Sequence, residues 1–197
     1  MAVCETGSAI MAYFYFDFKD LRKQTCHDLL LSLVSQLSTR SSPSCDILHR
    51  VYEAHENGTR QPSDDALTEC LKRMLGLRLP GTGPTFIILD ALDECPDSSA
   101  FPSPRDEVLQ LVKDLVDLRL QELHVCVTSR PEVDIRAVLE PLAFGSVSLH
   151  DESGQNADIA DYVRTVVNSS PSAAMRRWRA EDRNLVIDTL TERADGM

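Results

Sequence analysis

The sequence predicts an α/β fold, a three-layer sandwich built around a mostly parallel sheet. The first observation is the apolar run 86–89 (FIIL), whose bulky and β-branched residues lie on both alternating faces, as in a strand buried on both sides. The second is a similar run at 123–128 (LHVCVT). The third is the alternation of such strands with amphipathic helical segments, which indicates βαβ crossovers.

The first half of the chain supplies one further strand and three helices. Met11–Phe18 (MAYFYFDF) is rich in aromatic residues and predicts a strand. The expected helices lie at about 20–39, at about 45–56, and from the N-cap Ser63 to about Leu75. Ser41–Ser44 is expected to break the first of these helices. A turn at 80–84 leads into the strand at 86–89.

The second half continues the alternation and then becomes helical. The expected elements are a loop at 95–104, a helix at 105–120, the strand 123–128, a helix at about 132–140, a short strand at Val147–Leu149, and helices near 156–168, 172–179 and 181–194. We therefore expect an α/β core over residues 1–154 and a helical segment over 155–197, which begins a helical lid.

Three carboxylates follow the strand 86–89 directly: Asp90, Asp93 and Glu94. Such a group at the end of a buried strand is costly unless a cation lies there, and in an open parallel sheet this end is where ligands bind. The pattern predicts a Mg²⁺–phosphate site, with Asp90 holding the ion through water and one of the other two acids orienting or deprotonating a hydrolytic water. The alternative is that Asp93 and Glu94 only cap the following segment.

Arg130 ends the neighbouring strand in the sequence Thr128–Pro131 (TSRP). An arginine at the same edge of the sheet can contact a terminal phosphate with two hydrogen bonds and report whether that phosphate is present. The alternative is an ordinary surface ion pair.

These segments together resemble a known family. YFYFDFKD, FIILDALDECPD and VCVTSRPE are similar to the NACHT domain of STAND-class P-loop NTPases, above all to the large fungal group with nephrocystin-3-like amino-terminal domains, from about residue 8 to the end. The resemblance implies that Asp90 is the Walker B magnesium ligand, that Asp93 and Glu94 lie near the hydrolytic water, and that Arg130 is the sensor arginine. It also implies ATP or GTP with Mg²⁺, and a signalling switch that oligomerises.

One departure from that family concerns the phosphate-binding loop. Relatives carry G-x-x-x-x-G-K-[ST] before the aromatic strand, whereas only ten residues precede Met11 here. The run Gly76–Gly83 has similar glycine spacing, but it lacks the lysine, precedes a strand, and contains Pro80, which has no N–H. We expect the middle of a P-loop NTPase-like fold without its first (Walker A) strand.

The expected strand order is 11–18, 86–89, 123–128 and 147–149, and the resemblance puts the absent strand between the last two. Such a gap leaves unpaired strand edges, which are expected to close together, to self-associate or to bind a protein partner.

Composition narrows the class of partner. The formal net charge of −11 and the sequence pI near 4.8 argue against nucleic acid or an anionic membrane as the main partner. The six cysteines are scattered without zinc spacing, which predicts a reduced chain in the cytoplasm, and no apolar run reaches the length of a membrane span.

Three functions follow as hypotheses. The first is a fragment of a nucleoside-triphosphatase switch. We expect this fragment to be inactive, because the phosphate-binding amides and lysine are lacking. The cofactors are Mg²⁺ and ATP or GTP in the intact family, and we expect none in this fragment. The second is a non-catalytic scaffold or regulatory fragment that binds a full-length relative. The third is a metal-dependent phosphatase or nuclease that uses the three acids, with His150 and Asp151 as the nearest further ligands.

Overall fold

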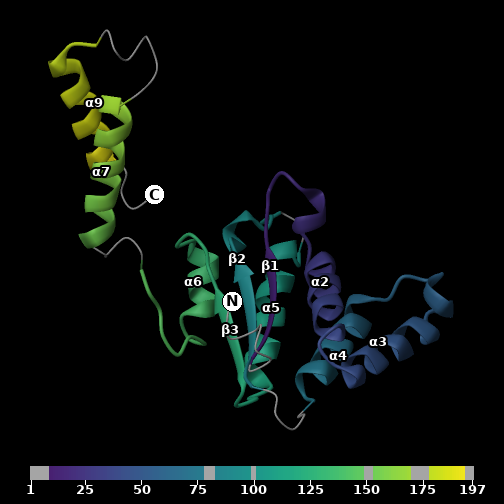
Figure 1. Cartoon of the computed structure of the whole chain (residues 1–197). Coiled ribbons are helices and arrows are strands. Elements are labelled where there is room, and N and C mark those ends of the chain that lie inside the picture. The colour runs from purple at the N-terminus through teal and green to yellow at the C-terminus, as the bar shows by residue number, and fades with distance from the viewer. Residues whose placement is uncertain (1–8, 78–82, 99–100, 149–152, 170–177, 194–197) are drawn as a thin grey trace. The chain divides into compact units, whose positions relative to one another are not determined.

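The computed structural model describes residues 9–77, 83–98, 101–148, 153–169 and 178–193 (Figure 1). The chain forms two compact units, Met1–Ala143 and Phe144–Met197, and each is described by itself. The first unit contains the sheet and the helices that pack on it.

The elements of the first unit, in chain order, are β1 (Ile10–Tyr15), η1 (Leu21–Lys23), α2 (Cys26–Ser38), α3 (Ser42–Ala54), η2 (Glu56–Gly58), α4 (Asp64–Leu75), β2 (Thr85–Asp90), η3 (Leu92–Glu94), α5 (Pro104–Asp117), β3 (Leu123–Val127) and α6 (Val133–Leu139). The second unit contains α7 (Ser153–Ser169) and α9 (Ala180–Arg193). Here η marks a 3₁₀ helix.

The three strands form one parallel sheet in the order β1–β2–β3. Thr85 of β2 pairs with Ile10 on one side and with Leu123 on the other, and Leu89 pairs with Phe14 and Val127. The predicted α/β class, the parallel sheet and the order of these three strands are confirmed.

Polar side chains fix where the helices begin. Ser63 accepts a hydrogen bond from the Ala66 N–H at the start of α4, as predicted. The first expected helix ends before Ser41–Ser44, as predicted, but the next helix begins at Ser42 and not at about 45. The Ser41 side chain caps α3, and Pro43 lies in its first turn, where the fixed φ of proline suits a helix and its missing N–H is not needed.

The expected fourth strand is absent from the described residues. Val147 and Ser148 have no strand conformation, and Val147 is 77% exposed, while Leu149 lies outside the described part. A strand requires a neighbouring strand to pair with, and neither Val147 nor Ser148 is paired in the described sheet. Residues 172–177 of the expected helix at 172–179 also lie outside the described part, and Trp178 and Arg179 are not helical.

The core of the first unit lies on one face of the sheet. Ala12, Phe14, Ile87 and Leu89 are buried there against α2 and α5, which pack side by side, with α4 and α3 beyond α2 (Figure 1). Both crossovers, β1 to β2 and β2 to β3, advance in the same direction across the sheet. Because such connections are right-handed, their helices must lie on the same face.

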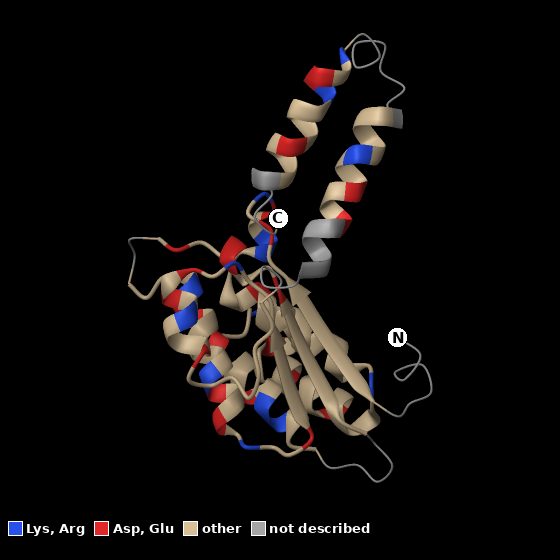
Figure 2. Ribbon diagram, turned by 90° about the vertical axis from the view of Figure 1, so that its left-hand side faces the viewer, with Lys and Arg blue, Asp and Glu red and all other residues tan. Residues whose placement is uncertain are grey.

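The opposite face is open in the described residues. It carries the alternate side chains of each strand, among them Tyr13 (52% exposed), Tyr15 (46%) and Phe86 (37%), together with the exposed Cys126. Apart from Asp90 the strands carry no acidic residue, Lys or Arg, as the tan ribbons in Figure 2 show. The second helical layer of a complete sandwich is therefore not supplied by the described residues of this unit.

The two edges of the sheet differ. At the β1 edge, the Gln36 side chain of α2 accepts from the Tyr13 N–H (3.1 Å) and donates to the Tyr13 carbonyl (2.7 Å), and Arg40 donates to the Met11 carbonyl (3.4 Å). At the β3 edge, no hydrogen bond joins the outward N–H and C=O groups of Val125 and Val127 to another described residue. Side chains therefore close the β1 edge, whereas no described side chain closes the β3 edge.

The buried face of α2 should dominate the stability of this unit. Leu29 is fully buried, so Leu29→Ala should lower the free energy of unfolding by about 2–5 kcal/mol through lost burial and the cavity left behind. Leu21, which is 80% exposed, provides the matched control. Leu21→Ala should change the free energy of unfolding by less than about 0.5 kcal/mol. Denaturant titration followed by circular dichroism measures both, and equal effects would contradict the described packing.

The cysteines should divide into two reactivity classes. Burial raises the pKa of Cys26 and of Cys95 to about 12, whereas Cys45 and Cys126 are exposed. Since the thiolate is the reactive form, alkylation of the native protein at pH 8 should label Cys45 and Cys126 at least about tenfold faster than Cys26 and Cys95. Peptide mass spectrometry gives each rate, and fast labelling of Cys26 in the folded protein would be inconsistent with its burial.

Candidate functional site

The carboxyl ends of β2 and β3 are joined by Thr128, the residue that follows β3. Its hydroxyl donates to Asp90 Oδ1 (2.5 Å) and accepts from the Ala91 N–H (3.0 Å). Its backbone N–H donates to the Leu89 carbonyl (2.9 Å), and its carbonyl accepts from Leu92 (3.0 Å). Four hydrogen bonds to one residue therefore set the direction in which the exposed Asp90 carboxylate points.

The chain turns sharply after Asp90. Ala91 lies in the left-handed region (φ 56°, ψ 48°), which a residue with a Cβ seldom adopts, and the 3₁₀ turn η3 begins at the next residue. Ala91 is small enough to accept this conformation, and its N–H is held by Thr128. The turn brings Asp93 and Glu94 back towards the ends of the neighbouring strands.

Asp93 contacts Arg130 with both carboxylate oxygens. Oδ1 accepts from the Arg130 backbone N–H (3.0 Å), and Oδ2 lies 3.4 Å from Arg130 Nε. The Asp93 side chain is only 13% exposed, whereas the Arg130 side chain is 75% exposed. The acid therefore anchors the loop after β3, and the guanidinium extends into solvent.

Glu94 joins the same arrangement from the other side. Its Oε2 accepts from the Phe18 backbone N–H (3.2 Å), in the segment that follows β1. The structure thus brings Asp90, Asp93, Glu94 and Arg130 together at the carboxyl edge of the sheet, as the sequence predicts. Asp93 and Glu94 both accept from backbone N–H groups, but these belong to Arg130 and Phe18 and not to the segment that follows, so these contacts are not the capping role that the sequence left open.

Two residues of this network were not singled out from the sequence. Thr128 was part of a quoted motif, but its hydrogen bond to Asp90 depends on the strand register. Arg105 was missed entirely, although a cation in the first turn of a helix is unfavourably placed against the helix dipole and so signals a specific partner.

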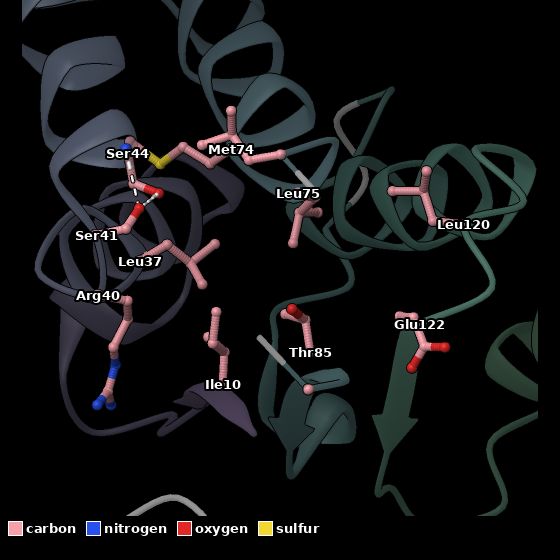
Figure 3. Close-up of a pocket in the computed structure, with 12 residues that line it drawn as sticks. Ile10, Leu37, Arg40, Ser41, Ser44, Met74, Leu75, Thr85, Leu120 and Glu122 are labelled. Atoms are coloured by element: carbon pink, nitrogen blue, oxygen red, sulfur yellow. Dashed lines mark hydrogen bonds between the residues drawn. The ribbon is translucent and has the colours of Figure 1, made fainter. Parts of the chain in front are cut away.

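Two cavities lie away from this edge. One of about 220 Å³ lies at the opposite, amino-terminal end of the strands, where Ile10, Leu37 and Thr85 line it beside the hydrogen-bonded pair Ser41 and Ser44 (Figure 3). The other, of about 460 Å³, lies between α2 and α3. Neither is lined by a predicted site residue.

The described residues do not form a metal centre from side chains alone. They contain no group of three or more His, Cys, Asp and Glu side chains placed to hold a metal ion together. His150 and Asp151, the expected further ligands of a metal-dependent phosphatase or nuclease, lie outside the described part. Mg²⁺ bound with a nucleotide requires less, because one or two carboxylates suffice when phosphates and waters complete the octahedron, and the exposed Asp90 fits that requirement.

No helix among the described residues is both long enough and apolar enough to cross a membrane.

The backbone strain at residue 91 gives a direct test of the turn. Glycine adopts the left-handed region freely, so Ala91→Gly should leave the free energy of unfolding unchanged or raise it by up to about 1 kcal/mol. A β-branched residue is strongly disfavoured there, so Ala91→Val should lower it by at least about 1–2 kcal/mol. Chemical denaturation measures both, and a tolerated valine would show that the turn is not left-handed.

Comparison with known proteins gives one match. The family model "Nephrocystin 3, N-terminal" matches residues 2–130, well over half of the chain. No curated protein and no solved structure matches. The matched segment contains all three strands, the acidic turn and Arg130, and the chain belongs to the nephrocystin-3 N-terminal family.

Proposed function

We propose that the carboxyl edge of the sheet is the acidic and arginine half of a Mg²⁺–nucleoside triphosphate site, in a fragment of a NACHT-type signalling switch that acts in the cytoplasm. The observation that supports this most is the placement of Asp90 and Arg130 in one hydrogen-bonded network, through Thr128 and Asp93, at the edge where open parallel sheets bind ligands.

Each side chain has a distinct task in this proposal. Asp90, fixed by Thr128, holds a water of the Mg²⁺ shell, and the ion when bound neutralises charge on the phosphates. Arg130 offers its exposed guanidinium to the terminal phosphate. Asp93 and Glu94 are the acidic pair next to the hydrolytic water.

The Asp93–Arg130 ion pair leaves most of the guanidinium available for the second task. Arg130 contacts Asp93 through Nε (3.4 Å) and through its backbone N–H, which donates to Asp93 Oδ1. Its two Nη nitrogens remain for a phosphate, while Asp93 holds the loop in place.

This 197-residue chain should not hydrolyse nucleotides at a measurable rate. Three carboxylates facing a polyanion with Mg²⁺ alone lack the backbone amides and the lysine that position the phosphates in P-loop enzymes. We expect no phosphate release from ATP or GTP above the rate without protein, by a colorimetric phosphate assay. Hydrolysis that Asp90→Asn removes would overturn this part of the proposal.

Weak binding should nevertheless be detectable. With millimolar Mg²⁺·ATP or Mg²⁺·GTP, we expect ¹H–¹⁵N NMR shifts confined to residues 89–94 and 128–130. These shifts should be lost in Asp90→Asn and in Arg130→Ala. Arg136→Ala is the matched control, because Arg136 is an exposed arginine of α6 that pairs with Glu140. Shifts elsewhere, or shifts that Asp90→Asn leaves unchanged, would refute the nucleotide site.

A second candidate is a non-catalytic scaffold that binds a full-length relative, and the free β3 edge specifically favours it. An extended segment could pair there with the outward N–H and C=O groups of Val125 and Val127, while Gln36 closes the β1 edge. The same edge could serve self-association.

The scaffold candidate has its own test. Val125→Pro removes an outward N–H and leaves the ladder to β2 intact, because the even-numbered residues of β3 make that ladder. Co-purification with a full-length relative should be lost in Val125→Pro and kept in Asp90→Asn. The opposite pattern would contradict a scaffold role for this edge.

A further inference from the structure

Arg105 is the most buried charged side chain near the acidic edge, and all its polar contacts go to two segments. Its Nε donates to the Cys95 carbonyl (3.0 Å) and its Nη2 to the Asp93 carbonyl (2.9 Å). Its Nη1 forms an ion pair with Asp134 of α6 (3.1 Å). The Arg105 side chain is 11% exposed, whereas that of Asp134 is 40% exposed.

The position of this arginine is unfavourable in itself. Arg105 lies in the first turn of α5, where the helix dipole disfavours a cation, and burial removes most of its hydration. The two carbonyls and the carboxylate compensate for both effects, and the planar fork of a guanidinium can reach all three at once. A lysine could not make these three directed contacts.

The two carbonyls belong to the acidic turn. They lie at Asp93, within η3, and at Cys95, directly after it, so Arg105 holds the turn from its inner side. Fixing the backbone at Asp93 fixes the direction of its side chain, which extends outward to Arg130. Asp93 is thus held between two arginines, one on its carbonyl and one on its carboxylate.

The ion pair with Asp134 anchors the other end of the Arg130 loop. That loop leaves β3 at Thr128, which is bonded to Asp90, and enters α6 at Val133, next to Asp134. Arg105 therefore connects the acidic turn to the helix that follows the loop, and both segments next to Arg130 are tied to one guanidinium.

We propose that Arg105 is a positioning residue: it sets the orientation of the Asp93 carboxylate and, through it and through α6, the place from which Arg130 extends. The inference rests on the proposed nucleotide site for its biological meaning. Its test uses the protein without nucleotide, so the two can fail separately.

The test compares Arg105→Lys with Arg136→Lys, an arginine-to-lysine control on the exposed pair with Glu140 of α6. In the folded Arg105→Lys protein, hydrogen exchange at the Arg130 amide should become about tenfold faster, as expected for losing one hydrogen bond to a charged group. The NMR signal of the Arg130 Nε–H should move towards that of a solvated arginine. Asp93→Asn serves as the reference for a weakened contact, and Arg136→Lys should change neither signal.

A purely structural arginine would lower the melting temperature and leave the Arg130 signals of the folded protein unchanged, and that result would overturn the proposal. If Arg105→Lys does not fold, Asp134→Ala removes only the outer contact of the guanidinium. It should speed exchange at the Arg130 amide at least about twofold while sparing amides in the core of α5. Unchanged exchange at Arg130 in a folded Asp134→Ala protein would equally overturn it.

The same variants separate the two proposals. Altered Arg130 signals in Arg105→Lys, together with no effect of Mg²⁺·ATP on any variant, would support the positioning role and refute the nucleotide site. Nucleotide-dependent shifts, together with Arg130 signals that are unchanged in Arg105→Lys, would support the nucleotide site and refute the positioning role.

Discussion

The register between β2 and β3 is the constraint on which the candidate site depends. Leu89 pairs with Val127, so Asp90 and Thr128 end their strands side by side and share a hydrogen bond. A slip of one residue would turn the buried Ile87 and Leu89 to the open face, which makes this register strongly preferred. Hydrophobic burial along two short strands thus determines the positions of the polar groups that directly follow Leu89 and Val127.

Much of this arrangement follows from local patterns in the sequence. The unbroken run 86–89 indicated a central strand, and the carboxylates after it were expected at the ligand-binding end of a parallel sheet. The alternation of strands and helices was sufficient to predict that β1, β2 and β3 form a parallel sheet. The side chain of Ser63 marked the start of α4 because capping is a local interaction.

What local patterns could not show are contacts between distant segments. The pairing of Asp93 with Arg130, the hydroxyl bridge from Thr128 and the three contacts of Arg105 each join residues 10 to 38 positions apart. The expected strand did not form at Val147 and Ser148 for a related reason, since so short a segment becomes a strand only when another strand pairs with it. The break after the first helix was predicted correctly, but Pro43 was assigned to that break although it lies in the first turn of α3. Proline both ends helices and begins them, and the cap from Ser41 distinguishes the two cases.

The difference between the two edges of the sheet also limits the geometry of any assembly built by strand pairing. Because Gln36 occupies the β1 edge, β3 is the edge that the described sheet leaves for pairing with the β3 strand of a second copy. Identical surfaces that meet each other are related by a two-fold axis, so the joined strands would run antiparallel and the pair would have no further edge to extend. One glutamine side chain thereby favours a closed dimer with a continuous six-stranded sheet over an open-ended fibre.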